Sequence, residues 1–149
     1  MTIKDSLTEA YGATAYVVLT EGGPLVARIG EPAPGIEALL ARLGHAVGVF
    51  ITGANPGSER RTPRENEAAN GRLEAQLRAI RLDPLPHEGV GDQGDWSEPG
   101  FFVPGLDIAD AAGLADEFGQ HAFVAVRIGA PASLHWTRSQ EARSRCREP

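Results

Sequence analysis

Apolar and polar positions follow one another along this chain in patterns that predict strands and helices. β-Branched and aromatic residues fill Thr14–Thr20, which predicts a strand, and residues 21–24 are typical of a turn. The apolar run at residues 25–29 predicts a second strand. The two runs and the turn between them therefore predict a β-hairpin.

The next two segments predict a helix followed by a buried strand. Apolar residues recur at helical spacing over Pro34–Leu43, and Gly44 follows the last of them, which predicts an amphipathic helix that ends at this glycine. Residues 46–51 are continuously apolar. Such a run is expected of a central strand that is covered on both faces.

A strong helix-start signal follows this strand. Thr62 suits the N-cap position, Pro63 suits the first helical position, and Glu65 completes a capping box. The predicted helix runs to about residue 81. Its apolar stripe consists of Leu73, Leu77 and Ile80.

The second half of the chain is less regular. Residues 82–100 are rich in Pro, Gly and Asp and predict a long loop or a broken strand, whereas residues 101–103 predict a short strand. Asp107 suits the N-cap of a helix that extends to Phe118, and residues 122–128 form the last predicted strand. From about Pro131 the chain is polar and arginine-rich, which predicts a frayed tail with order fading after Trp136.

The order of these elements is β-β-α-β-α-(β)-β-α-β, with a lead-in over residues 1–13. The fold class is therefore expected to be α/β (α+β), with a single mixed β-sheet packed by about three helices. We expect one globular domain over residues 1–130 and a polar tail over residues 131–149. The sequence does not predict the strand order or the oligomeric state.

Length, charge and cysteine content exclude several classes of protein. The chain has 149 residues and a formal net charge of −6, so we expect no general binding to nucleic acid, whose phosphates need a basic partner surface. The one cysteine, Cys146, cannot build a disulfide framework or a cysteine metal site. No apolar run has the length of a membrane span, and the N-terminus lacks a signal-peptide pattern, which predicts a cytoplasmic protein.

Polar residues gather where the buried strand ends, and they form the first candidate site. Thr52, Asn55 and Ser58 lie in the segment Ile51-Thr-Gly-Ala-Asn-Pro-Gly-Ser58, shortly before the capped helix. Ligand sites in open α/β sheets lie at strand ends, and the first amides of a helix attract anions. An ordinary Asn-Pro-Gly turn is the alternative, because these are the commonest turn residues.

Two further amides are expected to face this strand end. Asn66 lies one turn into the helix on the same face as Asn70 and Leu73, so its side chain should point toward the sheet near Asn55. Gln120 lies at another helix–strand junction, where it can contact a ligand or the open carbonyls of the helix end. We therefore expect Asn55, Asn66 and Gln120 to converge, as ligand-binding groups or as a network that fixes the loops.

An acidic segment with one aromatic residue supplies the remaining candidates. It contains Asp92, Asp95, Trp96 and Glu98. Trp96 should wall a pocket or close the edge of the core, and Glu98 is the candidate catalytic acid or base. The carboxylates match no EF-hand and the four histidines share no metal-ligand spacing, so we expect no metal site. No Ser–His–Asp order, P-loop or Gly-x-Gly-x-x-Gly motif is present, and no cofactor is predicted.

A set of short motifs is distributed over the chain from about residue 11 to residue 126. The set consists of Tyr11-x-x-Thr14-x-Tyr16, Ile51-Thr52, Asn55-Pro56 with Ser58, Glu65-Asn66 with Leu73 and Leu77, Trp96-x-Glu98, and Phe118-Gly119-Gln120-x-Ala122-Phe123. In this order the motifs resemble a small bacterial family catalogued as a domain of unknown function, DUF3293. The resemblance implies no activity. It does imply that a set of polar residues belongs to one shared feature, namely Asn55, Ser58, Glu65, Asn66, Trp96, Glu98 and Gln120.

Two functional hypotheses from different classes follow. In the first, a polar pocket binds a small anionic or nucleotide-like molecule, helix amides after Ser58 hold the anion, and Trp96 stacks on the ligand. In the second, the protein is a non-catalytic interaction or regulatory module whose polar residues are structural, and an edge strand or the arginine-bearing tail binds a protein partner. A cleft that reaches Asn55 and Glu98 favours the first hypothesis, and full burial of both favours the second.

Overall fold

A computed structural model describes residues 2–92, 94 and 96–147, with side chains described to residue 142. The strands of the described chain are β1 (Thr14–Thr20), β2 (Gly23–Ala27), β3 (Val47–Ile51), β4 (Leu85–Gly91), β5 (Ser97–Pro104), β6 (Ala122–Arg127) and β7 (Ser133–Trp136). Its helices are α1 (Ile3–Gly12), α2 (Pro34–Leu43), α3 (Pro63–Ala79), α4 (Ile108–Glu117) and α5 (Arg138–Arg147), with a 3-10 turn, η1, at Pro56–Ser58.

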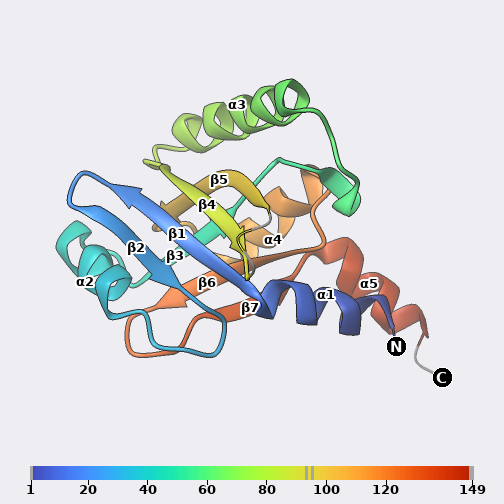
Figure 1. Cartoon of the computed structure of the whole chain (residues 1–149), viewed down its shortest axis with the longest axis horizontal. Coiled ribbons are helices and arrows are strands. Elements are labelled where there is room, and N and C mark those ends of the chain that lie inside the picture. Colours follow the sequence, from blue (N-terminus) through green and yellow to red (C-terminus); the bar gives the residue numbers. More distant parts are fainter. Residues whose placement is uncertain (1, 93, 95, 148–149) are drawn as a thin grey trace.

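All seven strands of the described chain form one sheet, in the order β2-β1-β4-β5-β3-β6-β7 (Figure 1). The predicted α+β class with a single sheet is confirmed. Each strand pair is antiparallel, so the expectation of a mixed sheet was wrong. Strands β3 and β4 run in the same direction, and β5 lies between them and pairs with both. An isolated parallel bridge joins Ile29, after β2, to Ala132, before β7, so the sheet curls until its two ends meet.

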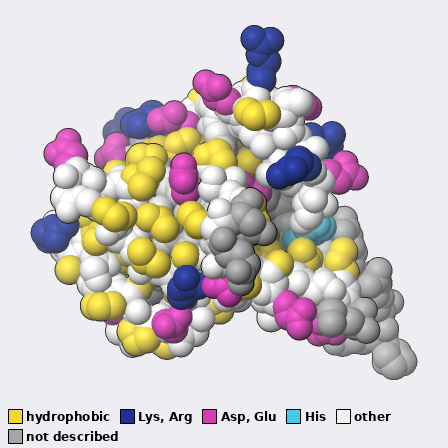
Figure 2. All heavy atoms as spheres, viewed as in Figure 1, with side chains coloured by type: hydrophobic (Ala, Val, Ile, Leu, Met, Phe, Trp, Pro, Cys, Tyr) yellow, Lys and Arg dark blue, Asp and Glu magenta, His cyan; other side chains and the backbone are white. Residues whose placement is uncertain are grey.

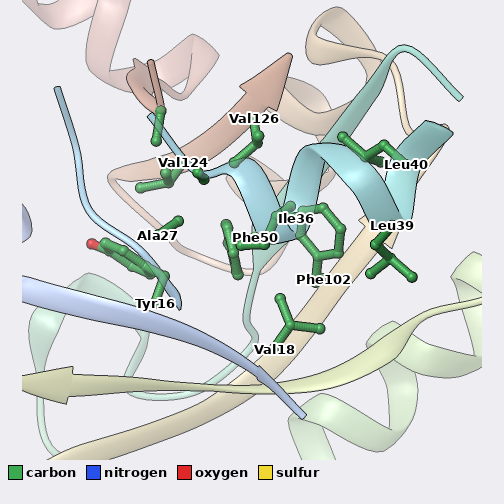
Figure 3. Packing of buried hydrophobic residues seen from close by; sticks show 12 residues of the cluster. Tyr16, Val18, Ala27, Ile36, Leu39, Leu40, Phe50, Phe102, Val124 and Val126 are labelled. Carbon is green, nitrogen blue, oxygen red and sulfur yellow. The ribbon is translucent and has the colours of Figure 1, made fainter. Parts of the chain in front are cut away.

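One hydrophobic cluster lies inside this curl. Tyr16 and Val18 of β1 pack in the same cluster as Val124 and Val126 of β6, although these strands are far apart in the sheet order. Figure 3 shows this inner cluster, in which α2 places Ile36 and its neighbours against the aromatic side chains of β3 and β5. Burial of these apolar side chains stabilises the curled form, at about 25 cal/mol for each Å² removed from water.

A second hydrophobic cluster covers the opposite face of the sheet. Helices α3 and α4 pack there, with Leu73 and Leu77 from α3 and Ala111 and Ala115 from α4. Successive side chains of a strand point to opposite faces, so β3 contributes residues to both clusters. The prediction that the apolar run at residues 46–51 is a central strand covered on both faces is confirmed.

The predicted start of α3 is also confirmed. The Thr62 hydroxyl accepts a hydrogen bond from the Glu65 amide at 3.1 Å, and the Glu65 carboxylate accepts one from the Thr62 amide at 3.2 Å. The far end of the helix differs from the prediction, since Ile80 is 58% exposed and lies at the C-cap rather than in the apolar stripe.

Residues 82–100, predicted to be a long loop or a broken strand, contain β4 and the start of β5. Proline and glycine made this segment resemble a loop, but β4 pairs with β1 and with β5 through backbone hydrogen bonds, which do not depend on side-chain type. The lead-in also contains more structure than predicted. Helix α1 starts with a capping box in which Thr2 and Asp5 exchange hydrogen bonds.

The C-terminal segment was predicted to be a polar tail from residue 131, and the described structure differs. Strand β7 extends the sheet beside β6, and α5 follows it and contacts α4. Thr137 and Gln140 are buried, and the Ser139 hydroxyl donates a hydrogen bond to Asp116 at 2.8 Å. Polar side chains anchor this segment, and a search for apolar periodicity cannot detect them. The side chain of Cys146 lies outside the described ones.

Part of the molecular surface is apolar. Leu19 and Val26, on the β1–β2 hairpin, are 44% and 51% exposed. Figure 2 shows hydrophobic side chains gathered over this hairpin and α2. No helix in the described part of the chain has the length and hydropathy needed to cross a membrane.

Candidate functional site

A pocket of about 630 Å³ lies where α1, the inner side of the sheet and the segment after β3 come together. In Figure 1, α1 and the green segment that follows β3 both lie toward the right-hand end of the sheet. All seven candidate site residues line it, namely Thr52, Asn55, Ser58, Asn66, Trp96, Glu98 and Gln120. Its volume lies within the range of roughly 300–1,000 Å³ that is typical of small-molecule sites. Asn55 and Glu98 are both partly buried and both line the pocket.

A chain of hydrogen bonds holds the Glu98 carboxyl group. The Asn55 side-chain amide donates to Glu98 Oε2 at 2.9 Å. The Asn55 Oδ1 atom accepts from the Arg61 backbone amide at 2.9 Å and from Asn66 Nδ2 at 3.0 Å. Because two donors fix the oxygen end of this amide, its nitrogen end must face Glu98. Asn66 and Asn55 therefore position the carboxyl group.

The loop that carries Asn55 has a strained backbone. Asn55 has a φ of 46° and Ser58 a φ of 61°, both in the left-handed region, which asparagine tolerates better than most residues. Asn66 Oδ1 accepts from the Asn55 amide at 2.9 Å, and Gln120 Nε2 donates to the Ala54 carbonyl at 2.9 Å. The expected convergence of Asn55, Asn66 and Gln120 is found, and part of its role is to hold this loop.

Thr52 and Asn70 join the end of β3 to β5 immediately after Glu98. The Thr52 hydroxyl donates to the Pro99 carbonyl at 2.7 Å, and Asn70 Nδ2 donates to the same oxygen at 3.0 Å. Asn70 Oδ1 accepts from the Gly53 amide at 2.8 Å. These polar groups form hydrogen bonds within the protein. Thr52 lines the pocket, and its hydroxyl donates to a backbone carbonyl there.

The expected cradle of helix amides after Ser58 is not formed. The Ser58 amide donates to the Asn55 carbonyl at 3.0 Å, and the Glu59 amide donates to the Pro56 carbonyl at 3.2 Å. At the start of α3 the capping box supplies its own carboxylate, that of Glu65. The positive charge at the pocket comes instead from Arg60 and Arg61, two exposed side chains that were not among the predicted site residues. Arg61 also lies 3.4 Å from an exposed carboxylate, that of Glu59.

Glu98 carries the only carboxyl group among the described side chains that line the pocket. Burial raises its pKa, and the hydrogen bond from Asn55 lowers it in part. Burial also raises the pKa of the Tyr11 and Tyr16 phenols, and the charge of Glu98 raises both further. The phenols are therefore neutral at physiological pH.

His87 of β4 is a second titratable group at the pocket. It is 5% exposed, and its ring contacts Phe50 at 5.2 Å and Tyr16 at 6.5 Å between ring centroids. Burial lowers its pKa to about 4, so the imidazole is neutral at pH 7. Its Nδ1 atom is buried and has no hydrogen-bond partner in the described structure. The sequence did not single out His87, because the four histidines share no metal-ligand spacing and residues 82–100 resembled a loop or a broken strand.

The acidic segment does not form a cluster around Glu98. Asp92 lies 3.5 Å from Arg28, and Asp95 lies outside the described residues. No group of three or more His, Cys, Asp or Glu suited to a metal ion is found among the residues that the structure describes. Trp96 is 42% exposed at the pocket, where its ring is available to a ligand.

The family comparison agrees with the motifs. Residues 51–123 match the family model described as "Protein of unknown function (DUF3293)". The resemblance to this family is thereby confirmed. The DUF3293 match runs from the end of β3 to the start of β6 and includes every candidate from Thr52 to Gln120, whereas Tyr11 and Tyr16 lie before it. No curated protein and no solved structure matches the chain.

Proposed function

We propose that the pocket binds a small molecule that carries an anionic group, and that Glu98 contacts this molecule as its acid or base. The observation that supports this most directly is a partly buried carboxyl group held by Asn55 in an open pocket of ligand size. A carboxyl group with a raised pKa, placed in a cleft, is a typical candidate for proton transfer.

The surroundings of Glu98 indicate how such a molecule is oriented. Arg60 and Arg61 lie at the exposed part of the pocket lining, where a guanidinium can bind a phosphate or carboxylate with paired hydrogen bonds. Trp96 supplies an exposed aromatic face in the same pocket lining. The anionic group therefore lies toward solvent and the rest of the molecule extends inward to Glu98. We place this activity in the cytoplasm, on the sequence pattern alone.

A thermal-shift screen with phosphorylated and carboxylated metabolites tests the proposal. We expect at least one compound to raise the melting temperature of the wild-type protein, and Glu98→Gln to reduce this shift. Glu88→Gln is the matched control, since Glu88 is a partly buried glutamate of β4 that does not line the pocket. Arg60→Gln should also reduce the shift, and its control is Arg72→Gln on the exposed surface of α3.

The alternative is a non-catalytic interaction or regulatory module. It is favoured by the hydrogen bonds that Thr52 and Gln120 make to backbone carbonyls, which give both side chains a structural role. Under this alternative no compound shifts the melting temperature, and mass spectrometry finds no small molecule released from the denatured purified protein. That pair of results would overturn the small-molecule proposal.

A further inference from the structure

The inner part of the pocket contains a strip of sheet without a side chain. Gly89 of β4 pairs with Tyr16 of β1 on one side and with Glu98 of β5 on the other. Paired residues of antiparallel strands face the same side of the sheet. A Cβ atom at Gly89 would meet only Thr14 Cγ2 at 3.5 Å and the Glu98 carbonyl oxygen at 3.8 Å, so the space above this glycine is open to the pocket.

This strip has the dimensions of one planar ring. Neighbouring strands lie about 4.8 Å apart, so Tyr16 and Glu98 are separated by roughly 10 Å across Gly89. His87 precedes Gly89 by two residues on the same face, about 7 Å along the strand. Its imidazole extends over Gly100, where a Cβ atom would lie 2.6 Å from His87 Cε1. Tyr16, His87 and Glu98 therefore border an open area whose base is the backbone of Gly89.

The hydrogen bonds already made in this area determine what it offers to a ligand. The Tyr11 hydroxyl donates to the Ala122 carbonyl at 3.4 Å, the Tyr16 hydroxyl to the Tyr11 carbonyl at 3.4 Å, and the Thr14 hydroxyl to the Ala10 carbonyl at 2.8 Å. These three hydroxyl groups therefore donate their hydrogen bonds to backbone carbonyls of the protein and not to a ligand. A Glu98 carboxylate has about four acceptor positions, of which Asn55 occupies one, and a neutral imidazole has one acceptor nitrogen.

The inner pocket thus presents acceptors and aromatic surfaces, and its complement is a flat molecule with N–H donors along one edge. We infer that it recognises a planar nitrogen heterocycle with two adjacent N–H donors. The Glu98 carboxylate accepts both hydrogen bonds, and the ring lies over Gly89 in the area that Tyr16 and His87 border. This inference rests on the proposed function, because the anionic group of the same molecule is placed at Arg60. A purine nucleotide with a ring N–H beside a 2-amino group, as in guanosine monophosphate, has both features.

Titration calorimetry with three probes tests this inference. The probes are guanosine 5′-monophosphate, inosine 5′-monophosphate, which lacks the 2-amino group, and ribose 5-phosphate, which lacks the base. We expect the guanine nucleotide to bind roughly tenfold more tightly than the inosine nucleotide, since one hydrogen bond to a charged acceptor is lost. Ribose 5-phosphate should bind most weakly. In Glu98→Gln the preference for guanine should disappear, whereas in Glu88→Gln it should remain.

Two variants of Gly89 provide a test that does not remove a polar group. Gly89→Leu places a side chain over the strip and should reduce guanine nucleotide affinity at least tenfold, down to that of ribose 5-phosphate. Gly89→Ala, whose Cβ makes only ordinary contacts, should have a smaller effect and remain folded by circular dichroism. Undiminished guanine nucleotide binding by folded Gly89→Leu would overturn the inference.

The outcomes separate this inference from the proposed function. If guanosine monophosphate and ribose 5-phosphate bind equally well and both depend on Arg60, the base-recognition inference is overturned and the anionic-ligand proposal stands. If the two purine nucleotides bind equally well, recognition of two N–H donors is overturned. If none of the probes binds and the metabolite screen is also negative, both proposals are overturned.

Discussion

The burial of His87 predicts a specific dependence of stability on pH. Its pKa is about 4 in the folded protein and 6.5 in an ordinary environment. Below pH 6.5 the unfolded chain therefore binds a proton at this residue while the folded protein does not, so stability falls as the pH decreases through this window. Below about pH 4 both states are protonated and the loss levels off.

The size of this effect follows from the shift in pKa. One unit of pKa corresponds to about 1.4 kcal/mol, so His87 should lower the free energy of unfolding by about 2 kcal/mol at pH 5 and about 3 kcal/mol at pH 4, relative to pH 7.5. Glu98 acts in the opposite direction. Its raised pKa contributes stability at low pH that is lost as the pH rises through its folded value.

Urea unfolding of wild type and His87→Phe between pH 4 and pH 8 measures the His87 effect. Phenylalanine keeps an aromatic ring beside Phe50 and removes a buried nitrogen that has no partner, so the variant should be close to wild type at pH 7.5. Subtracting the two profiles cancels the other titrating groups. Repeating the pair in a Glu98→Gln background tests whether the difference is independent of the Glu98 titration. Parallel pH profiles in both backgrounds would show that His87 is not buried in its neutral form.

Three further predictions concern stability. Thr62→Ala should lower the free energy of unfolding by about 1 kcal/mol through loss of the N-cap acceptor. Thr62→Ser keeps this acceptor and should lose little stability. An unchanged melting temperature of Thr62→Ala would contradict the capping box. Gly48→Ala should cost about 1–3 kcal/mol, because the new Cβ overlaps the Phe102 ring. In its control, Gly71→Ala, the new Cβ meets no atom within 4 Å beyond the neighbouring residues and backbone of its own helix. This variant should stabilise α3 by up to about 1 kcal/mol, and equal effects of the two substitutions would contradict this packing. Deletion of residues 138–149 should lower stability but leave unfolding cooperative, since neither hydrophobic cluster includes a described residue of α5. A non-cooperative unfolding transition of the truncated protein would show that α5 is a core element.

Local patterns in the sequence were sufficient for the elements whose stability is local. Strand β1 and helix α2 have the predicted bounds, and the Thr62 capping box and the Asp107 N-cap are formed as predicted. In each of these the signal and the interaction lie within a few residues of each other, either as a hydrogen bond across one helical turn or as an alternation of side chains along one strand.

The polar residues of the site were also recognisable from the sequence, for the same reason. Thr52, Asn55 and Ser58 follow directly after a continuously apolar strand, and Asn66 shares a helical face with buried residues. Local spacing does not predict how close these residues lie to Glu98 in the folded protein. That contact joins residues that are 43 positions apart, through the pairing of β5 with β3 and β4.

Only the tertiary structure decided which polar groups remain available to a ligand. The amides after Ser58 form turn hydrogen bonds, so the positive charge at the pocket comes from arginine side chains. His87 and Gly89 belong to a strand whose proline and glycine content resembles a loop, and they face the pocket because β4 is held between β1 and β5 by backbone hydrogen bonds. Backbone pairing does not depend on side-chain type, and the curl of the sheet depends on apolar side chains of distant strands that pack in one cluster. Local patterns therefore predicted many of the elements and the candidate residues, whereas the packed sheet determines the pocket that they form.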